Sequence, residues 1–466
     1  MENTSNERRT LFTVMATSFM TTFMGSSINL ALPTMGQEYG SSAVLTSWAI
    51  TSYLLASAAF LLPLGRLSDI IGRRRMYLTG TIFYTLFSLI ATLASSMEIV
   101  ITLRLLQGIG AAMIFSTGMA ILTSVYPPEK RGRALGFSVA VTYLGLSVGP
   151  VLGGIMNHYL GWRSIFYFTT LLGLGAIAGI HFGLRGEWAS ARGEKFDIFG
   201  SVLYMAGILA FLYGLSAIAD FIGARYLVLL GLGLLALYVY WELKIEYPIL
   251  QVRLFKQNIT FAFSNLAAMI NYSATFAITF LLSIYFQVIR GYDSQTAGFI
   301  LLAQPLVMAI LSPYAGTLSD RMEPRLVASL GMGCSTLSLF FFTFISTTTS
   351  PFLLVANLIL AGLGFALFAS PNNNAIMGSV PPPLYGIASS TLGTMRLVGQ
   401  AISMSIATML IALFIGQVTL TEVNPDILLN CMQVSFVVFT ILAILGILAS
   451  LKRGHLHSSD VAIKGE

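Results

Sequence analysis

The stretch GRLSDIIGRR, residues 65–74, returns later in the chain as GTLSDRMEPR, residues 316–325. Aligning the two copies places Asp69 on Asp320 and Arg74 on Arg325. Two further echoes follow in the same order, QGIGAA (107–112) with AGLGFA (361–366) and PPEKRG (127–132) with PPPLYG (381–386). A duplication of this length predicts two parts of the chain with the same arrangement of secondary structure.

The composition predicts that these two parts lie in a membrane. Of the 466 residues, 56% are hydrophobic and only 9% are charged, which is too apolar for a water-soluble domain. Long apolar runs recur, and crossing roughly 30 Å of hydrocarbon at about 1.5 Å per residue requires runs of this length. Strands would leave backbone groups unpaired in lipid, so we predict helices.

We therefore predict an all-α integral membrane protein with fourteen transmembrane helices. They lie near residues 11–35, 43–65, 76–95, 98–124, 132–157, 164–184, 197–218, 225–243, 258–289, 296–315, 326–346, 351–376, 384–417 and 428–451. The long segments 258–289 and 384–417 fit either tilted helices or helices that extend beyond the membrane.

The lysines and arginines predict the orientation. If the N-terminus is cytoplasmic, 20 of the 25 fall in cytoplasmic segments, while Arg163, Arg225 and Arg290 fall outside. Only Arg104 and Arg396 lie within spans. Because positive charge stays on the cytoplasmic side of short loops, we expect a multi-pass plasma-membrane protein with both termini in the cytoplasm. The formal charge of +6 then reflects topology and contact with anionic lipid, and no nucleic-acid partner is expected.

The repeat predicts how the helices are grouped. We expect a six-helix half in residues 1–190, two additional helices in 191–256, and a second six-helix half with a cytoplasmic tail in 257–466. Parallel halves with a site between them near the midplane are typical of alternating-access transporters.

The sequence offers little support for other classes of protein. Cys334 and Cys431 both fall in predicted spans, and HLH (455–457) is best interpreted as part of a solvated tail. We therefore expect no metal site and no cofactor. The chain has no HExxH, GxSxG or GxxxxGK motif and no soluble domain of useful size, which argues against a membrane-embedded enzyme or sensor.

Three motifs give the chain a family resemblance. Gly65, Asp69, Gly72, Arg73 and Arg74 fit the pattern G-x-L-x-D-x-x-G-R-R, and Arg104, Gln107, Gly108 and Gly110 fit R-x-x-Q-G-x-G. GLSVGPVLGG, residues 145–154, fits G-x-x-x-G-P-x-x-G-G. With these motifs the chain resembles the major facilitator superfamily, specifically its fourteen-span drug:proton antiporter branch. The resemblance implies a transporter fold, export and proton antiport.

The first motif also has a physical interpretation. Gly65 and Gly72 permit a tight turn, and Asp69 can accept charge-assisted hydrogen bonds from arginines or from a helix N-terminus in the partner half. We expect a breakable latch, with Asp320 and Arg325 as counterparts in the second copy. The simpler alternative, that Arg73 and Arg74 only fix topology, leaves Asp69 and its echo unexplained.

The third motif predicts a close helix contact. Gly145, Gly149, Gly153 and Gly154 leave one helix face almost without side chains, and Pro150 is expected to bend that helix. A partner helix can then pack closely and pivot. Ordinary packing of small residues is the alternative, and it does not exclude a role in conformational exchange.

Polar residues inside the apolar spans are the candidates for the substrate or proton pathway. By helical rise Arg104 lies about 10 Å from the outer edge and Arg396 about 17 Å from the inner edge, with Gln400 on the same face. A buried cation is expected to face a partner or a water-filled cavity. The other candidates are Asn29, Gln107, Tyr143, Asn265, Asn271, Tyr272, Gln304, Asn372 and Asn373. Hydrogen bonding between helices is the alternative for most of them.

The run SPNNNAIM, residues 370–377, raises a separate expectation. Asn372, Asn373 and Asn374 cannot all face one way on a helix. Pro371 directly before them predicts a broken or kinked segment, a feature that transporters use to expose backbone groups.

One expected residue is missing. Members of this branch usually carry an aspartate in the first helix, upstream of N-x-A-L-P, but here Asn29 to Pro33 follow MGSS (24–27). We place none of the 19 acidic residues in the middle of the membrane. A site with two arginines and no acid should favour neutral or anionic cargo.

The sequence therefore predicts a secondary transporter that exports small amphipathic organic compounds, with H+ as the coupling ion implied by the resemblance. The alternative is an exporter of an organic anion or metabolite with other or no proton coupling. A monomer is compatible with either interpretation.

Overall fold

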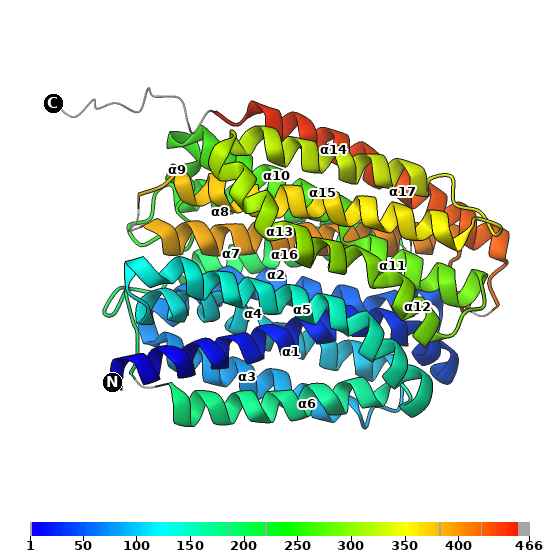
Figure 1. Cartoon of the computed structure of the whole chain (residues 1–466), viewed down its shortest axis with the longest axis horizontal. Coiled ribbons are helices and arrows are strands. Elements are labelled where there is room, and N and C mark those ends of the chain that lie inside the picture. Colours follow the sequence, from blue (N-terminus) through cyan, green and yellow to red (C-terminus); the bar gives the residue numbers. More distant parts are fainter. Residues whose placement is uncertain (1, 185, 220, 382–383, 421, 455–466) are drawn as a thin grey trace.

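Helices account for the regular structure of this chain. The computed structural model describes residues 2–184, 186–219, 221–381, 384–420 and 422–454, and within these ranges it contains no strand longer than the isolated bridge between Ser42 and Thr419. The helices lie side by side along the long axis of the molecule (Figure 1). The apolar segments of the sequence therefore form one elongated helical bundle.

The helices of the first half of the chain follow the predicted spans closely. They are α1 (Glu2–Tyr39), α2 (Ala43–Ile71), α3 (Arg73–Ala91), α4 (Met97–Val125), α5 (Pro128–Leu160), α6 (Arg163–Ala178), α7 (Ile198–Ser216), α8 (Gly223–Glu242) and the short α9 (Val252–Gln257). A π-helical turn, Gly179–Gly183, extends α6. Several helices begin at side-chain caps, as α2 does at Ser42 and α7 at Asp197.

Two predicted spans of the second half, 258–289 and 296–315, are interrupted helices. Segment 259–289 comprises α10 (Ile259–Thr275), α11 (Ala277–Ile284) and the π-helical Tyr285–Ile289. Segment 294–321 comprises α12 (Ser294–Leu301) and α13 (Ala303–Arg321). The remaining helices are uninterrupted, namely α14 (Pro324–Phe342), α15 (Pro351–Gly378), α16 (Tyr385–Phe414) and α17 (Pro425–Lys452).

Thirteen helical segments of the described chain are long and apolar enough to cross a membrane, one fewer than the fourteen predicted from the sequence. The helix that falls short is α3, which matches the predicted span 76–95. Its first turn consists of Arg73, Arg74 and Arg75, and these charges lower its mean hydropathy. Because α3 packs on α4 and α6, it is nevertheless a full member of the bundle.

The sequence predicts a broken or kinked segment at Pro371, and of these two alternatives the structure excludes the break. Pro371 lies within α15, which runs as one helix from Pro351 to Gly378. Pro150 likewise lies inside the single helix α5. The interruptions of the long helices occur instead at Phe276 and Leu302, neither of which is a proline.

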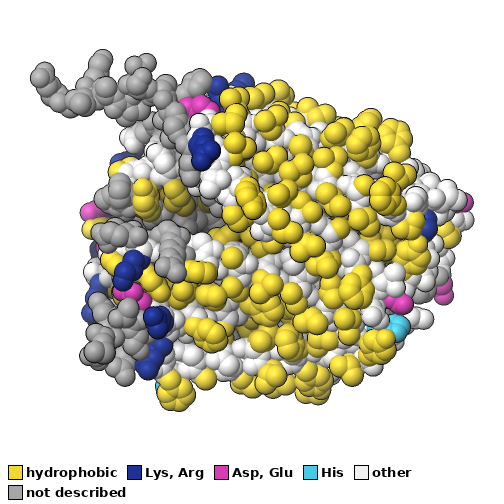
Figure 2. All heavy atoms as spheres, in the orientation of Figure 1, with side chains coloured by type: hydrophobic (Ala, Val, Ile, Leu, Met, Phe, Trp, Pro, Cys, Tyr) yellow, Lys and Arg dark blue, Asp and Glu magenta, His cyan; other side chains and the backbone are white. Residues whose placement is uncertain are grey.

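Surface chemistry distinguishes the two ends of the bundle. Figure 2 shows hydrophobic side chains over the middle of the visible face, while most of its lysines and arginines gather at the end where the N-terminus lies in Figure 1. We call this the basic end and the opposite one the far end. The apolar belt between them is what a protein surrounded by lipid requires.

Two groups of helices make up the bundle. Helices α1 to α6 pack mainly on one another, as do α10, α11 and α13 to α17, while α12 packs mainly on α5. We call these groups the first and second bundles. The helices α7 and α8 pack together, and α7 contacts both α2 of the first bundle and α16 of the second.

Candidate functional site

Arg396 on α16 lies where the two bundles meet. Tyr272 on α10 lies next to it, and Tyr143 of α5 and Tyr53 of α2 lie within reach of its charge. Tyr143 in turn lies near Ser312 on α13. Arg396, Tyr143 and Tyr272 remain partly exposed, whereas Tyr53 is buried. We call Arg396, Tyr53, Tyr143 and Tyr272 the Arg396 cluster.

Arg104 on α4 is only 1% exposed and holds three helices of the first bundle together. Its Nε donates to the carbonyl oxygen of Ala49 on α2 at 3.0 Å, and its Nη1 donates to Oε1 of Gln107. Gln107 donates from Nε2 to Ser88 on α3 at 2.6 Å. Through these bonds Arg104 connects neighbouring helices, which is the alternative to a role in the substrate or proton pathway.

Tyr53 connects these two arginines. The guanidinium of Arg104 lies over the ring of Tyr53, 4.2 Å from the ring centroid. Tyr53 also lies within reach of the positive charge of Arg396. Neither arginine takes part in the ion pairs that the described residues form. The centre of the protein therefore presents cationic and phenolic groups, in line with the absence of a central acid from the sequence.

The glycine motif of α5 has two faces. Gly145, Gly149 and Gly153 lie against α1, where an added Cβ would collide with Thr22, Ser26 or Ser27. The hydroxyl of Ser27 donates to the carbonyl oxygen of Gly149 at 2.8 Å. This face fixes α5 within the first bundle.

The second face of the motif contacts the second bundle. A Cβ at Gly154 would collide with the backbone of Ser294 on α12, and a Cβ at Gly298 of α12 would collide with the carbonyl oxygen of Pro150. These backbones touch because neither glycine carries a side chain. The predicted close approach is present, and it joins the two bundles.

Polar contacts close the same seam at the far end. Ser47 and Thr51 of α2 lie 3.1 and 3.0 Å from the hydroxyl of Thr408 on α16. The N–H of Ala43 donates to the carbonyl oxygen of Val418 at 2.9 Å. The start of α2 and the end of α16 are therefore tied together.

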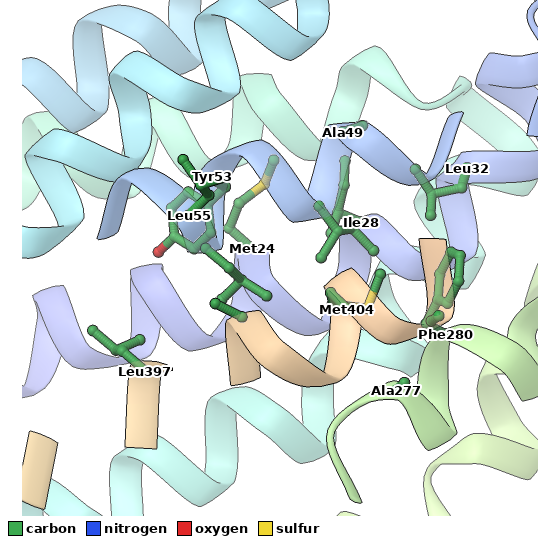
Figure 3. Packing of buried hydrophobic residues seen from close by; sticks show 14 of the residues in the cluster. Met24, Ile28, Leu32, Ala49, Tyr53, Leu55, Ala277, Phe280, Leu397 and Met404 are labelled. Atoms are coloured by element: carbon green, nitrogen blue, oxygen red, sulfur yellow. The ribbon is translucent and has the colours of Figure 1, made fainter. Parts of the chain in front are cut away.

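Apolar packing continues this seam toward the centre. Ser283 of α11 donates to the carbonyl oxygen of Asn29 on α1 at 2.7 Å. Figure 3 shows the surrounding side chains from α1, α2, α11 and α16, among them Met24, Ile28, Leu32, Ala49, Tyr53, Phe280, Leu397 and Met404. The two bundles thus form one continuous core on the far-end side of the Arg396 cluster.

The predicted latch residue Asp69 pairs within its own loop. Its carboxylate lies 2.7 Å from the guanidinium of Arg73, and its carbonyl oxygen accepts the N–H of Ala191 at 2.9 Å. Arg73 also donates to Ser124 of α4 and to Ser190. The sequence predicts either arginines or a helix N-terminus of the partner half as the partner of Asp69, and in the structure the partner is an arginine.

A segment that the sequence analysis did not single out covers this loop. We call residues 186–197, which lead into α7, the strap. Its Glu194 forms an ion pair with Arg66, and its Glu187 lies 3.7 Å from Nε of Arg75. The sequence did offer one signal for this contact: the strap carries acidic residues, and the loop that it covers carries basic ones.

Backbone hydrogen bonds hold the strap in register with the loop. The N–H of Arg73 donates to the carbonyl oxygen of Trp188, and the N–H of Arg74 donates to Glu187, both at 2.8 Å. Gly72 between them has a φ of +120°, and a Cβ there would collide with Glu187. Glycine is therefore required at position 72 both for its conformation and for the approach of the strap.

The second copy of the motif, residues 316–325, lies at the junction of α13 and α14, which corresponds to the junction of α2 and α3 in the first copy. Asp320 is near the end of α13 and Arg325 near the start of α14, as Asp69 and Arg74 flank the junction of α2 and α3. The side chain of Asp320 lies outside the described residues. The Nε of Arg325 is buried without a hydrogen-bond partner among the described residues.

The other predicted polar residues do not gather at one place. Asn29 and Asn265 use their amide groups to bond carbonyl oxygens one turn earlier in their own helices. The Nδ2 of Asn271 is buried and has no partner in the described chain. Gln304 and Gln400 are partly exposed, Asn372 is buried and Asn373 is exposed. The asparagine run thus faces several directions, as expected.

Arg453 is a buried cation that the sequence analysis missed. It follows α17, is 1% exposed, and donates to Oδ1 of Asn372 at 2.8 Å. Burial lowers the pKa of Arg453 to about 10, and the charge of Arg325 adds to this effect. Its position at the end of a predicted span indicated only a topology charge, because the residues that enclose it come from other helices.

Sequence comparison assigns this helical architecture to a family. The profile described as Major Facilitator Superfamily matches residues 14–197 and 265–461, which is most of the chain. The chain belongs to the major facilitator superfamily. Helices α7 and α8 lie between the two segments that match the superfamily profile.

Similar proteins in this superfamily are transporters by name. The chain is 30% identical to riboflavin transporter RibZ of Clostridioides difficile over 81% of this chain and 82% of that protein. It is 29% identical to multidrug resistance protein Stp of Mycobacterium tuberculosis over 88% of this chain and 77% of that protein. A solved bacterial homolog of the lysosomal transporter Spinster superposes with a TM-score of 0.69 at 14% identity, covering 96% and 97% of the two chains. This chain is therefore a multi-pass membrane transporter of small molecules with the major facilitator fold.

Proposed function

We propose that this transporter exports small amphipathic organic compounds across the plasma membrane by alternating access, as a member of the fourteen-span branch. The observation that carries the proposal is the contact of Gly154 and Pro150 on α5 with Ser294 and Gly298 on α12. The two bundles meet there through backbone, so at this contact they can separate without releasing interlocked side chains. A seam that opens in this way is what alternating access requires.

The proposed organisation has two six-helix halves, residues 1–190 and 257–466, around two additional helices in 191–256. The gap between the two matched segments of the superfamily profile supports this division. The basic end is the cytoplasmic end in this proposal, since lysine and arginine mark cytoplasmic loops. The closed far-end seam then faces outward.

A second candidate cargo is an organic anion or an uncharged metabolite. The Arg396 cluster favours it, because an arginine without an ion pair, next to three phenol rings, attracts planar groups that carry negative charge or hydrogen-bond acceptors. The similarity to a protein named as a riboflavin transporter supports a small aromatic metabolite, and the similarity to a multidrug resistance protein supports broader export. Proton antiport is supported by the resemblance to the drug:proton branch.

Transport in liposomes distinguishes these candidates. The purified chain is reconstituted, a pH gradient is imposed, and uptake is measured for a panel of cationic, neutral and anionic aromatic compounds. We expect gradient-driven transport of neutral or anionic members. Gradient-driven cation uptake that persists in Arg104→Ala would overturn the argument from the charge of the central site. Uptake that is equal with and without the gradient would overturn proton antiport.

A further inference from the structure

Two carboxylates are buried together at the base of the additional helices. Asp197 caps the start of α7, and Glu242 is the last residue of α8, so both lie at the same end of this helix pair. Their exposed fractions are only 7% and 2%. Glutamate and aspartate are almost never buried to this degree without a partner of opposite charge.

The two side chains converge on Gly200. Asp197 accepts the N–H of Gly200 at 2.9 Å and the indole N–H of Trp241 at 3.0 Å. Its Oδ2 and the Oε1 of Glu242 both lie within 3.2 Å of the point where a Cβ of residue 200 would stand. Glycine at this position therefore leaves the space in which the two carboxylates approach each other.

Glu242 has an unused oxygen in this space. Its Oε2 accepts the N–H of Leu250 at 3.1 Å, but its Oε1 is buried and has no hydrogen-bond partner among the described residues. A buried carboxylate oxygen without a donor is costly. Within the described residues this oxygen therefore lacks a donor.

A tyrosine beside Glu242 also lacks a hydrogen bond. Tyr238, 3% exposed, lies beside Glu242, yet its hydroxyl is buried and makes no hydrogen bond of ordinary geometry in the described chain. Tyr204 packs against Tyr238 with ring centroids 5.3 Å apart, but its own hydroxyl donates to the carbonyl oxygen of Ala58. Tyr204 is therefore not available to complete the site.

Among the described residues, no positive charge compensates the pair. The groups that face Glu242 are Asp197 from α7, Tyr238 from its own helix, and the backbone of Ile249 and Leu250 from the segment before α9. Across the described residues, neither carboxylate forms an ion pair with lysine, arginine or histidine. Burial and a neighbouring like charge both favour a protonated carboxyl over an ionised one.

We propose that Glu242 and Asp197 share one proton and form a proton-binding site at the base of α7 and α8. A proton on Oε1 of Glu242 can be donated to Asp197, which removes one of two adjacent negative charges. The site is separate from the Arg396 cluster, and the proposal does not depend on which compound the protein transports.

Infrared difference spectroscopy of the full chain in nanodiscs tests this proposal, with the pH stepped through the neutral range and the proton itself as the probe. We expect a protonated-carboxyl C=O band at neutral pH in the wild type that is lost in Glu242→Gln. Glu246→Gln, an exposed acid in the adjacent segment, is the matched control and should keep the band. Absence of the band from the wild type, or its survival in Glu242→Gln, would overturn the proposal.

A second variant tests whether the proton is shared. Asp197→Asn removes the neighbouring charge but keeps a side chain that caps α7 well. Glu242 should then release its proton at a pH lower by about one unit or more. An unchanged midpoint would mean that Glu242 is protonated alone, and sharing would be refuted. Retained helical circular dichroism and size-exclusion behaviour in each variant establish that the comparison is between folded proteins.

Discussion

Ser294 on α12 donates a hydrogen bond from Oγ to the carbonyl oxygen of Gly154 on α5, 3.0 Å away. The same carbonyl belongs to a helix whose other glycine face is fixed against α1. A contact between the bundles thus rests on one small residue and one backbone acceptor, and it is a sensitive place to perturb.

Gly154→Ala should open the far-end seam. The added Cβ collides with the backbone of Ser294, and overpacking of this kind costs about 1–3 kcal/mol. Thr408→Cys, in a chain without its two native cysteines, should then react several-fold faster with a membrane-impermeant maleimide added on the far-end side. Gly136→Ala in the same helix meets open space and is the control. Equal labelling of the two variants would contradict this assignment of the seam.

Arg396→Gln should weaken transport of anionic compounds. The change removes the charge beside Tyr272 and Tyr143 while preserving hydrogen-bonding capacity. A charge-assisted hydrogen bond contributes about 1.5–3 kcal/mol, so KM for an anionic substrate should rise at least about tenfold. Arg225→Gln, an exposed arginine before the apolar part of α8, is the control. The prediction fails if KM rises equally for cationic and anionic substrates.

Glu194→Lys should release the strap from the loop that it covers. It replaces the ion pair with Arg66 by a repulsion, and the double variant Arg66→Glu with Glu194→Lys should restore the attraction. Both side chains are partly exposed, so we expect an effect of about 1 kcal/mol or less. Hydrogen exchange of the Ala191 amide, which is bonded to Asp69, is the measurement. Lys195→Glu, at an exposed neighbour, should leave this exchange unchanged, and a failure of the double variant to slow it would argue against the pairing.

Arg453→Lys should destabilise the second bundle. A lysine cannot reproduce the planar contacts with Asn372 and Ser450, and the buried acceptors that remain cost about 1–3 kcal/mol. Thermal unfolding in detergent should therefore occur at a lower temperature than in the wild type. Lys452→Arg, the exposed neighbour, should leave Tm unchanged. If Arg453→Lys unfolds at the wild-type temperature, the contacts of this arginine are not stabilising.

The helices were largely predictable because length and hydropathy act locally. The predicted spans 351–376 and 428–451 agree with α15 and α17 to within a few residues at each end. Pro371 misled the prediction, because neighbouring helices can support a proline inside a membrane helix. The interruption at Phe276 carries no comparable sequence signal, whereas the one at Leu302 precedes Pro305, which lacks the N–H that would donate to the carbonyl oxygen of Leu301.

The site was predictable residue by residue but not as an arrangement. Arg396, Tyr143 and Tyr272 are conspicuous as polar groups within apolar spans, yet their proximity depends on how three helices pack. Glu242 shows the opposite case, because a place at the end of a span predicts exposure to water, whereas the following segment folds back and buries it. The local composition of a segment does not predict tertiary contacts of this kind.

The two faces of α5 imply different distance changes during a transport cycle. If the bundles move as bodies, the separation of Ser27 from Gly149 stays constant, because both residues belong to the first bundle. The separation of Gly154 from Ser294 must grow each time the far end opens. Two pairs of spin labels, each with one label on α5, would measure both separations. Rigid-body rocking predicts an unchanged distance between α5 and α1 and a bimodal distance between α5 and α12. Bending of α5 itself would change the first distance as well.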